Sequence, residues 1–294
     1  MISYQLLVSI IFSGYMCEQT LVTFVRFYRL VLPQTNARST KDLITYKKIG
    51  YLKLQKCAST SIQNILLRFA VKNNRNIVLG EDGNILGYDN HFNRKMIQNT
   101  IWEKAHLQYH MFLCHTRWDH FEISSILGDN GSDVFYFTFI RDPVDLYRSF
   151  WDYNDFSKAY NRTLEEHVAT TIVDELKYNN STTRIPCFNQ MLYVFGLDFC
   201  DVKYKDKVEQ KIKEIDKTFD LILLADTEFF KDSIVLLMNE LRWENDDMIN
   251  MKLNSRARYK QSIVSPWARK TLQGNYHYPI LKALEEQISI ILYA

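Results

Sequence analysis

The residues with the clearest potential for chemistry lie in one short stretch, Gln55 to Ser61, where a lysine is followed closely by small hydroxyl side chains. An apolar run ends at Leu54 just before it, and apolar residues recur at helical spacing from Ile62 onwards. The stretch therefore joins a predicted strand to a predicted helix. The first N–H groups of a helix have no intrahelical partner and lie at its positive dipole end, so they favour a bound phosphate. We expect Lys56 and the hydroxyl groups to complete such an anion site.

Two other interpretations of this stretch remain open. Ser59 or Thr60 could simply cap the helix, because small hydroxyl residues often accept a hydrogen bond from its first N–H groups. A nucleotide kinase or ATPase is a weaker alternative, because the stretch lacks the glycines of the G-x-x-x-x-G-K-[ST] motif.

A second candidate anion site follows the apolar run 134–140. Arg141 comes directly after this run, and Pro143 is suited to the first turn of a helix. Ser149 would then lie about two turns into that helix. The guanidinium and the hydroxyl could converge on one phosphate, for which arginine has a matching fork geometry. The alternative is a structural pair between Arg141 and Asp142.

Both candidate sites depend on the elements that would position them. Strand-length apolar runs, rich in β-branched or aromatic residues, alternate with segments of helical spacing such as 62–69 and 234–241. This alternation predicts an α/β domain with a largely parallel sheet flanked by helices. Ligands of such sheets bind beyond the carboxyl ends of the strands. The four predicted strands are 48–54, 110–114, 134–140 and 219–225.

Composition excludes several classes of protein. The net charge of +2 over 294 residues gives no sign of the basic face expected of a nucleic-acid binder. The five cysteines include no C-x-x-C pair, so we expect no zinc site and no other metal.

The first 16 residues carry no charge and are largely apolar. We expect a signal-anchor over residues 1–25, a polar stem over 26–42 and one folded domain over 43–294. A cleaved signal peptide and a buried N-terminus are the alternatives. Acceptor sequons for N-glycosylation support the secretory interpretation, and they begin at Asn130, Asn161, Asn179 and Asn180.

Longer motifs give a more specific indication. The stretch Tyr51–Phe69 resembles the 5′-phosphosulfate loop and helix of the galactose-3-O-sulfotransferase family, and Phe139–Phe150 resembles that family's 3′-phosphate motif. Shorter resemblances occur in the family's order at Cys114–Trp118, Phe188–Met191 and Lys252–Arg256. Together they cover roughly residues 45–270.

The resemblance implies a P-loop-like sulfotransferase fold that uses 3′-phosphoadenosine 5′-phosphosulfate (PAPS) and needs no metal. It implies that Lys56 also stabilises the negative charge of the leaving group and that His115 is the base, with His120 in reserve. The cofactor-binding residues implied are Lys56, Cys57, Ala58, Ser59, Thr60, Ser61, Arg141, Ser149 and Arg256.

The implied activity is transfer of a sulfuryl group to a sugar hydroxyl, the 3-OH of galactose on a glycolipid or glycoprotein glycan, by a single-pass Golgi membrane protein with a lumenal catalytic domain. A uronyl or heparan-type 2-O-sulfotransferase is the alternative, because its loop is closer to the Lys56–Ser61 run. A protein of the same fold that binds the nucleotide or a glycan without turnover is the third, because Gln55 stands where many family members have histidine.

Overall fold

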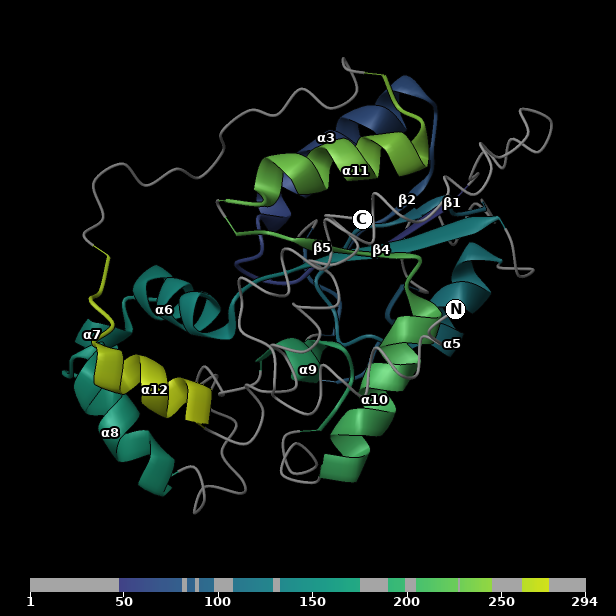
Figure 1. Cartoon of the computed structure of the whole chain (residues 1–294). Coiled ribbons are helices and arrows are strands. Elements are labelled where there is room, and N and C mark those ends of the chain that lie inside the picture. Colours follow the sequence, from purple (N-terminus) through teal and green to yellow (C-terminus); the bar gives the residue numbers. More distant parts are fainter. Residues whose placement is uncertain are drawn as a thin grey trace, which may run out of the picture. The chain divides into compact units, whose positions relative to one another are not determined.

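The computed structural model (Figure 1) describes the chain from residue 48 to residue 274 with gaps, and all described residues belong to one compact unit. The predicted anchor, the predicted stem and Arg256 lie outside the described residues. The described ranges are 48–80, 84–87, 90–97, 108–128, 133–174, 190–198, 205–226, 228–244 and 261–274.

The centre of this unit is a five-stranded sheet in the order β2-β3-β1-β4-β5. Every neighbouring pair of strands is parallel. The predicted α/β class with a parallel sheet is therefore confirmed. The strands are β1 (Lys48–Leu52), β2 (Ile77–Val78), β3 (Met111–Phe112), β4 (Val134–Ile140) and β5 (Leu221–Leu224).

The two longest strands are buried along their whole length, because helices cover both faces of the sheet. Such strands need apolar residues at consecutive positions instead of the alternation of a half-exposed strand. Gly50 of β1 is paired with Tyr136 of β4, and a Cβ atom at Gly50 would lie 2.4 Å from the Tyr136 ring. Glycine therefore lets the tyrosine ring lie across the neighbouring strand.

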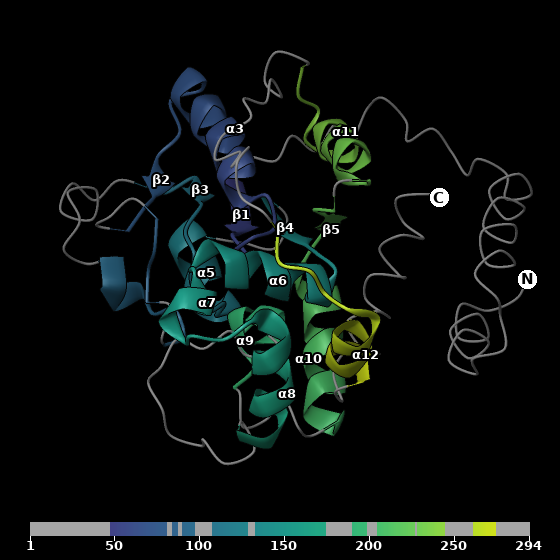
Figure 2. The ribbon, with the colours of Figure 1, turned by 90° about the vertical axis from the view of Figure 1, so that its left-hand side faces the viewer.

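Helices α3 and α11 lie on one face of the sheet, whereas α5 and α10 lie on the other (Figures 1 and 2). The Phe69 ring of α3 stacks on Trp243, just beyond α11, with 4.0 Å between ring centroids. The helices are α3 (Ser59–Lys72), α5 (His120–Leu127), α6 (Pro143–Tyr153), α7 (Phe156–Ala159), α8 (Leu164–Asp174), α9 (Gln190–Val194), α10 (Lys205–Thr218), α11 (Phe230–Leu241) and α12 (Pro266–Gly274), with a short 3₁₀ helix η1 (Arg94–Ile97).

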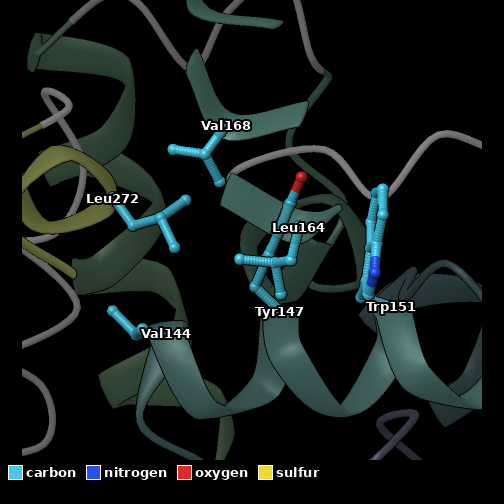
Figure 3. Close-up of a cluster of buried hydrophobic side chains, with 6 residues drawn as sticks. All are labelled: Val144, Tyr147, Trp151, Leu164, Val168 and Leu272. Carbon is cyan, nitrogen blue, oxygen red and sulfur yellow. The ribbon is translucent and has the colours of Figure 1, made fainter. Parts of the chain in front are cut away.

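A second hydrophobic cluster joins α6, α8 and α12 (Figure 3). It fixes α6, the helix that follows Arg141, against the C-terminal part of the described chain. Its fully or nearly buried members are Val144, Tyr147, Trp151, Leu164, Val168 and Leu272.

All four predicted strands agree with the structure in position, but only one of them agrees in length. The run 134–140 matches β4, whereas 110–114 contains only the two-residue β3 and 219–225 contains the four-residue β5. The short strand β2 was not predicted. Within the described residues, no helix is both long and apolar enough to cross a bilayer. Asn161 is exposed in the turn between α7 and α8, and the other three acceptor asparagines lie outside the described residues.

Candidate functional site

The segments that follow β1, β3, β4 and β5 all leave the sheet at the same edge, because the strands are parallel. The structure therefore brings together the regions in which the sequence predicted chemistry. Lys56, His115 and Arg141 each lie within a few residues of a strand's carboxyl end.

The loop between β1 and α3 has an unusual backbone. Lys56 and Ala58 have positive φ angles of 61° and 53°, and the φ of Cys57 between them is not positive. Such alternation turns successive backbone N–H groups towards one concave side, which is the geometry of an anion-binding nest. The loop thus forms a cradle without any glycine.

The start of α3 also favours an anion. Its N-cap is Ala58, and among the described residues no side chain makes a capping hydrogen bond there. The first turn contains no acidic residue, so its dipole is not offset by a carboxylate. The alternative in which Ser59 or Thr60 caps the helix does not agree with the structure, because both residues lie inside the first turn.

Side chains of the loop differ in what they can offer a ligand. Thr60 is exposed, Ser61 is half-buried and Ser59 is nearly buried. The Cys57 side chain is fully buried, and burial raises the pKa of its thiol to about 12. Cys57 can therefore contribute to a phosphate site only through its backbone.

Lys56 itself is half-buried, and its ammonium lies over the ring of Tyr153, 3.8 Å from the centroid. A cation at this distance is attracted by the ring face. Tyr153 is the last residue of α6. The lysine of the first predicted site thus touches the helix that carries the second.

Arg141 joins the two sites directly. Its Nη1 donates a hydrogen bond of 3.2 Å to the backbone carbonyl of Lys56, and its Nε lies 3.5 Å from a carboxylate oxygen of Asp226. Burial raises the pKa of the Asp226 carboxyl above its usual value. Asp142 donates its backbone N–H to the same carboxylate. The ion pair in the structure is thus between Arg141 and Asp226, whereas the alternative considered from the sequence was a pair with Asp142.

The N-terminus of α6 is built differently from that of α3. Asp142 caps it by accepting a hydrogen bond from the Asp145 backbone N–H at 2.9 Å. A phosphate near this helix would therefore be held by side chains, with Arg141 at the helix start and the half-buried Ser149 about two turns further on.

His115 is buried beside the first site. Its Nδ1 lies 2.5 Å from the backbone carbonyl of Lys53. A carbonyl oxygen can only accept, so Nδ1 must carry a proton. In the neutral imidazole, Nε2 then has the lone pair with which a general base accepts a proton. His120, the predicted reserve, packs its ring against Trp118 and Tyr136 instead.

The position of His120 makes it the weaker candidate. Tyr136, which its ring contacts, lies four residues before the carboxyl end of β4 at Ile140, about 13 Å along the strand. His115 in contrast lies three residues after the end of β3 and contacts the residue that follows β1.

Comparison with known proteins identifies the chain. A family model described as galactose-3-O-sulfotransferase matches residues 7–275. The chain belongs to the galactose-3-O-sulfotransferase family. It is 34% identical to galactose-3-O-sulfotransferase 2 of Mus musculus over 76% of its own length and 57% of that protein. It is 27% identical to galactosylceramide sulfotransferase of Homo sapiens over 71% of its own length and 49% of that protein.

A third relative, galactose-3-O-sulfotransferase 3 of Mus musculus, is 27% identical over 79% of the chain and 53% of that protein. The chain thus spans about half the length of the curated relatives it matches. The family membership predicted from the sequence resemblance is therefore confirmed.

Two further polar residues lie near the site. Arg117 is buried, and its Nη2 lies 2.7 Å from a carboxylate oxygen of Asp198. Gln55 accepts a hydrogen bond of 3.3 Å from the side-chain amide of Gln190. Within the described residues, no group of three or more His, Cys, Asp or Glu side chains is arranged to hold a metal ion.

Sequence reasoning missed three residues of this edge. Asp226 follows β5 and could have been found by the same rule that pointed to Arg141, namely a polar residue after an apolar strand. Tyr153 and Lys53 gave no such signal, because an aromatic residue in a helix and a lysine beside a strand are common.

Proposed function

We propose that the protein transfers a sulfuryl group from PAPS to the 3-OH of galactose in a glycolipid or glycoprotein glycan. Family membership supports the reaction class, and it favours galactose over the uronyl or heparan-type acceptor. The observation that carries the proposal is the hydrogen bond from Arg141 to the Lys56 carbonyl, because it makes two anion sites neighbours at one sheet edge. One bisphosphorylated adenosine could then span both.

The residues at this edge fit such a ligand. The concave loop from Lys56 to Ser61 and the uncapped start of α3 suit the 5′ phosphosulfate. Arg141 and Ser149 suit the 3′ phosphate. When bound, PAPS supplies an activated sulfuryl group and leaves as adenosine 3′,5′-bisphosphate (PAP). The late segment with Arg256 is proposed to add a further contact, from residues outside the described part of the chain.

Two side chains have proposed chemical roles. His115 accepts the proton of the acceptor hydroxyl at Nε2, because its Nδ1–H is engaged with the Lys53 carbonyl. Lys56 holds the negative charge that develops on the leaving oxygen at the mouth of the loop.

The proposed location is the Golgi membrane, with residues 1–25 as the anchor and the sheet domain in the lumen. The uncharged, apolar start of the chain supports this proposal. The glycan acceptor and the membrane are the partners it implies.

A ligand test separates the proposal from a kinase. Thermal unfolding is measured with PAP, with ATP and magnesium, and without ligand. PAP at about 100 times its Kd should stabilise the chain by about 2.7 kcal/mol. ATP with magnesium should give no comparable shift. Stabilisation by ATP and magnesium alone would contradict the proposal.

An acceptor test with radiolabelled PAPS follows, using galactose-terminated glycans and uronic-acid glycans in parallel. Transfer to galactose is expected, and Lys56→Met should reduce it by about 100-fold or more. Transfer only to the uronic-acid acceptors would point to the 2-O-sulfotransferase alternative.

A second candidate function is nucleotide or glycan binding without turnover. It is favoured by Gln55, whose amide is bonded to Gln190 where many family members have a histidine. PAP binding without transfer to any acceptor would support it, and restored transfer in Gln55→His would assign the loss to this position.

A further inference from the structure

Lys53 is a buried cation that the proposed chemistry does not use. It lies directly after β1, and its residue is only 2% exposed. A buried ammonium group is stable only when it is well hydrogen-bonded. Its Nζ donates to the side-chain oxygen of Gln63 at 2.6 Å and to the side-chain oxygen of Asn84.

Both amide partners of Lys53 hold the chain next to His115. Gln63, on α3, donates its amide N–H to the carbonyl of Leu113, two residues before the histidine, at 3.1 Å. The backbone carbonyl of Asn84 accepts the backbone N–H of His115 at 2.8 Å. The ammonium therefore contacts two residues that fix the backbone just before the His115 side chain.

Lys53 also touches His115 through its own backbone. Its carbonyl oxygen accepts the Nδ1 proton of the imidazole. The direction of the Lys53 carbonyl depends on the position of Lys53. This position is fixed by the hydrogen bonds of its buried ammonium group to Gln63 of α3 and to Asn84.

We propose that Lys53 is a positioning residue that fixes the orientation and the Nδ1–H tautomer of His115 relative to the phosphate-binding loop. It acts through His115 and does not touch the reacting atoms. This inference rests on the proposed function for its kinetic consequence, but its structural consequence can be measured without any turnover.

Loss of the Lys53 ammonium group is expected to disturb the position of His115. In Lys53→Met, the side-chain oxygens of Gln63 and Asn84 lose the donor that lies between them. Partly buried acceptors without a donor reorient towards other groups or water. The contacts that fix the chain just before His115 then loosen, and the imidazole is no longer held in one tautomer.

Lys48 provides a matched control at the other end of the same strand. It is also buried, and its ammonium donates to the Gly128 carbonyl at 3.1 Å and pairs with Asp133 at 3.4 Å. Lys48→Met therefore removes a buried lysine of β1 at the amino end, away from His115. A general loss of stability should appear in both variants, whereas loss of histidine positioning should appear only in Lys53→Met.

The first measurement is the tautomer of His115 by NMR with ¹⁵N-labelled histidine, assigned through the signal that disappears in His115→Gln. The wild type and Lys48→Met should show a protonated Nδ1 and an unprotonated Nε2. Lys53→Met should show an exchange average of both tautomers. If Lys53→Met keeps the wild-type pattern, the positioning role is overturned.

Gln63→Leu is the second variant, in case Lys53→Met does not fold. Gln63 is only half-buried, and its replacement removes both the Lys53 contact and the Leu113 contact. It should shift the His115 signal in the same direction as Lys53→Met, and an unchanged signal would count against the proposal.

The second measurement is a double-mutant cycle on turnover. Lys53→Met should lower kcat by about 10- to 100-fold and leave the affinity for PAP unchanged. In a His115→Gln background the same change should have no further effect, because the two residues act as one unit. Equal losses in both backgrounds would overturn the inference. Absence of transfer by the wild type would instead contradict the proposed function, and the NMR result would still decide the role of Lys53.

Discussion

Cys57 and Lys56 are neighbours in the chain but lie in opposite environments. The thiol is fully buried, and burial raises its pKa to about 12, whereas the neighbouring ammonium reaches the Tyr153 ring near the surface. One peptide unit thus separates an inert group from a cation that can meet a ligand. At this edge of the sheet, the direction of each side chain decides whether it can contact a ligand.

His167 shows how an aromatic environment affects a titrating group. Its ring is buried between Tyr160 and Trp151, with centroid distances of 5.3 Å and 4.7 Å. Burial, followed by the nearby Arg162 charge, lowers the pKa of His167 from its ordinary value of 6.5. The folded protein therefore prefers the neutral imidazole.

This preference gives a pH dependence with a definite sign. As the pH falls through 6.5, His167 gains a proton more readily in the unfolded chain than in the folded one, so acid destabilises the fold. His167→Phe removes this proton uptake and should reduce the loss of melting temperature between about pH 7.5 and about pH 5.5. The measurement is thermal unfolding of both proteins at both pH values. Equal losses would show that His167 does not contribute.

At the scale of elements, two strand-to-helix junctions at one sheet edge are built in opposite ways. Helix α3 has Ala58 as its N-cap, and its first turn contains hydroxyl residues and no acidic residue. Helix α6 in contrast is capped by the Asp142 carboxylate. The positive end of α6 is thus already occupied by the protein's own negative charge. Only the α3 junction leaves its dipole to an external anion.

A substitution at Ala58 tests this difference. Ala58→Asp places a carboxylate at the start of α3, where it should favour the helix and repel a phosphate. We expect the PAP affinity to fall by at least about tenfold without a lower melting temperature. Ala58→Asn is the neutral control, because asparagine also tolerates a positive φ. Calorimetric titration with PAP compares the two, and similar affinities would exclude the α3 start as the anion site.

The sequence allowed the prediction of elements with strong local patterns. Strand β4 was predicted to the residue, because six apolar or aromatic residues and the β-branched Thr138 form one run that ends at Ile140, just before Arg141. Strand β2 has only two residues, and its pairing with β3 rather than its composition makes it a strand. Helix α3 was predicted from spacing, but its cap at Ala58 was not, because a positive φ at alanine has no sequence signal.

The residues of the candidate site also differ in whether the sequence allowed their prediction. Lys56, Arg141 and His115 could be located, because each follows an apolar run at the edge that parallel strands share. Their partners could not be predicted, because Asp226 and Tyr153 come from distant parts of the chain. Tertiary pairing over such distances leaves no periodic pattern in one sequence.

At the scale of the whole described chain, the segment 261–274 binds back onto the helices that follow β4. Ser262 donates its backbone N–H and its hydroxyl to the Asp152 carboxylate of α6. Ser265 donates its N–H to Glu165 of α8 at 3.0 Å, and Arg269 lies 3.3 Å from Asp145. The segment is thus held by polar contacts beside the hydrophobic cluster of Figure 3.

Asp152→Ala tests how strongly this segment depends on its anchor. The change should cost about 1–3 kcal/mol and raise hydrogen exchange in residues 261–274 more than in the sheet. Asp216→Ala on the exposed face of α10 is the control and should change neither quantity. Hydrogen-exchange mass spectrometry measures both variants. Exchange that rises evenly over the whole chain would contradict a local anchor.

The glycine-free loop after β1 has a consequence for how a ligand arrives. The positive φ angles of Lys56 and Ala58 each cost about 1 kcal/mol, and this cost is offset during folding, before a ligand binds. A preorganised loop loses little conformational entropy on association. Encounter with the nucleotide should therefore resemble rigid docking, and glycine at either position would ease folding but weaken recognition.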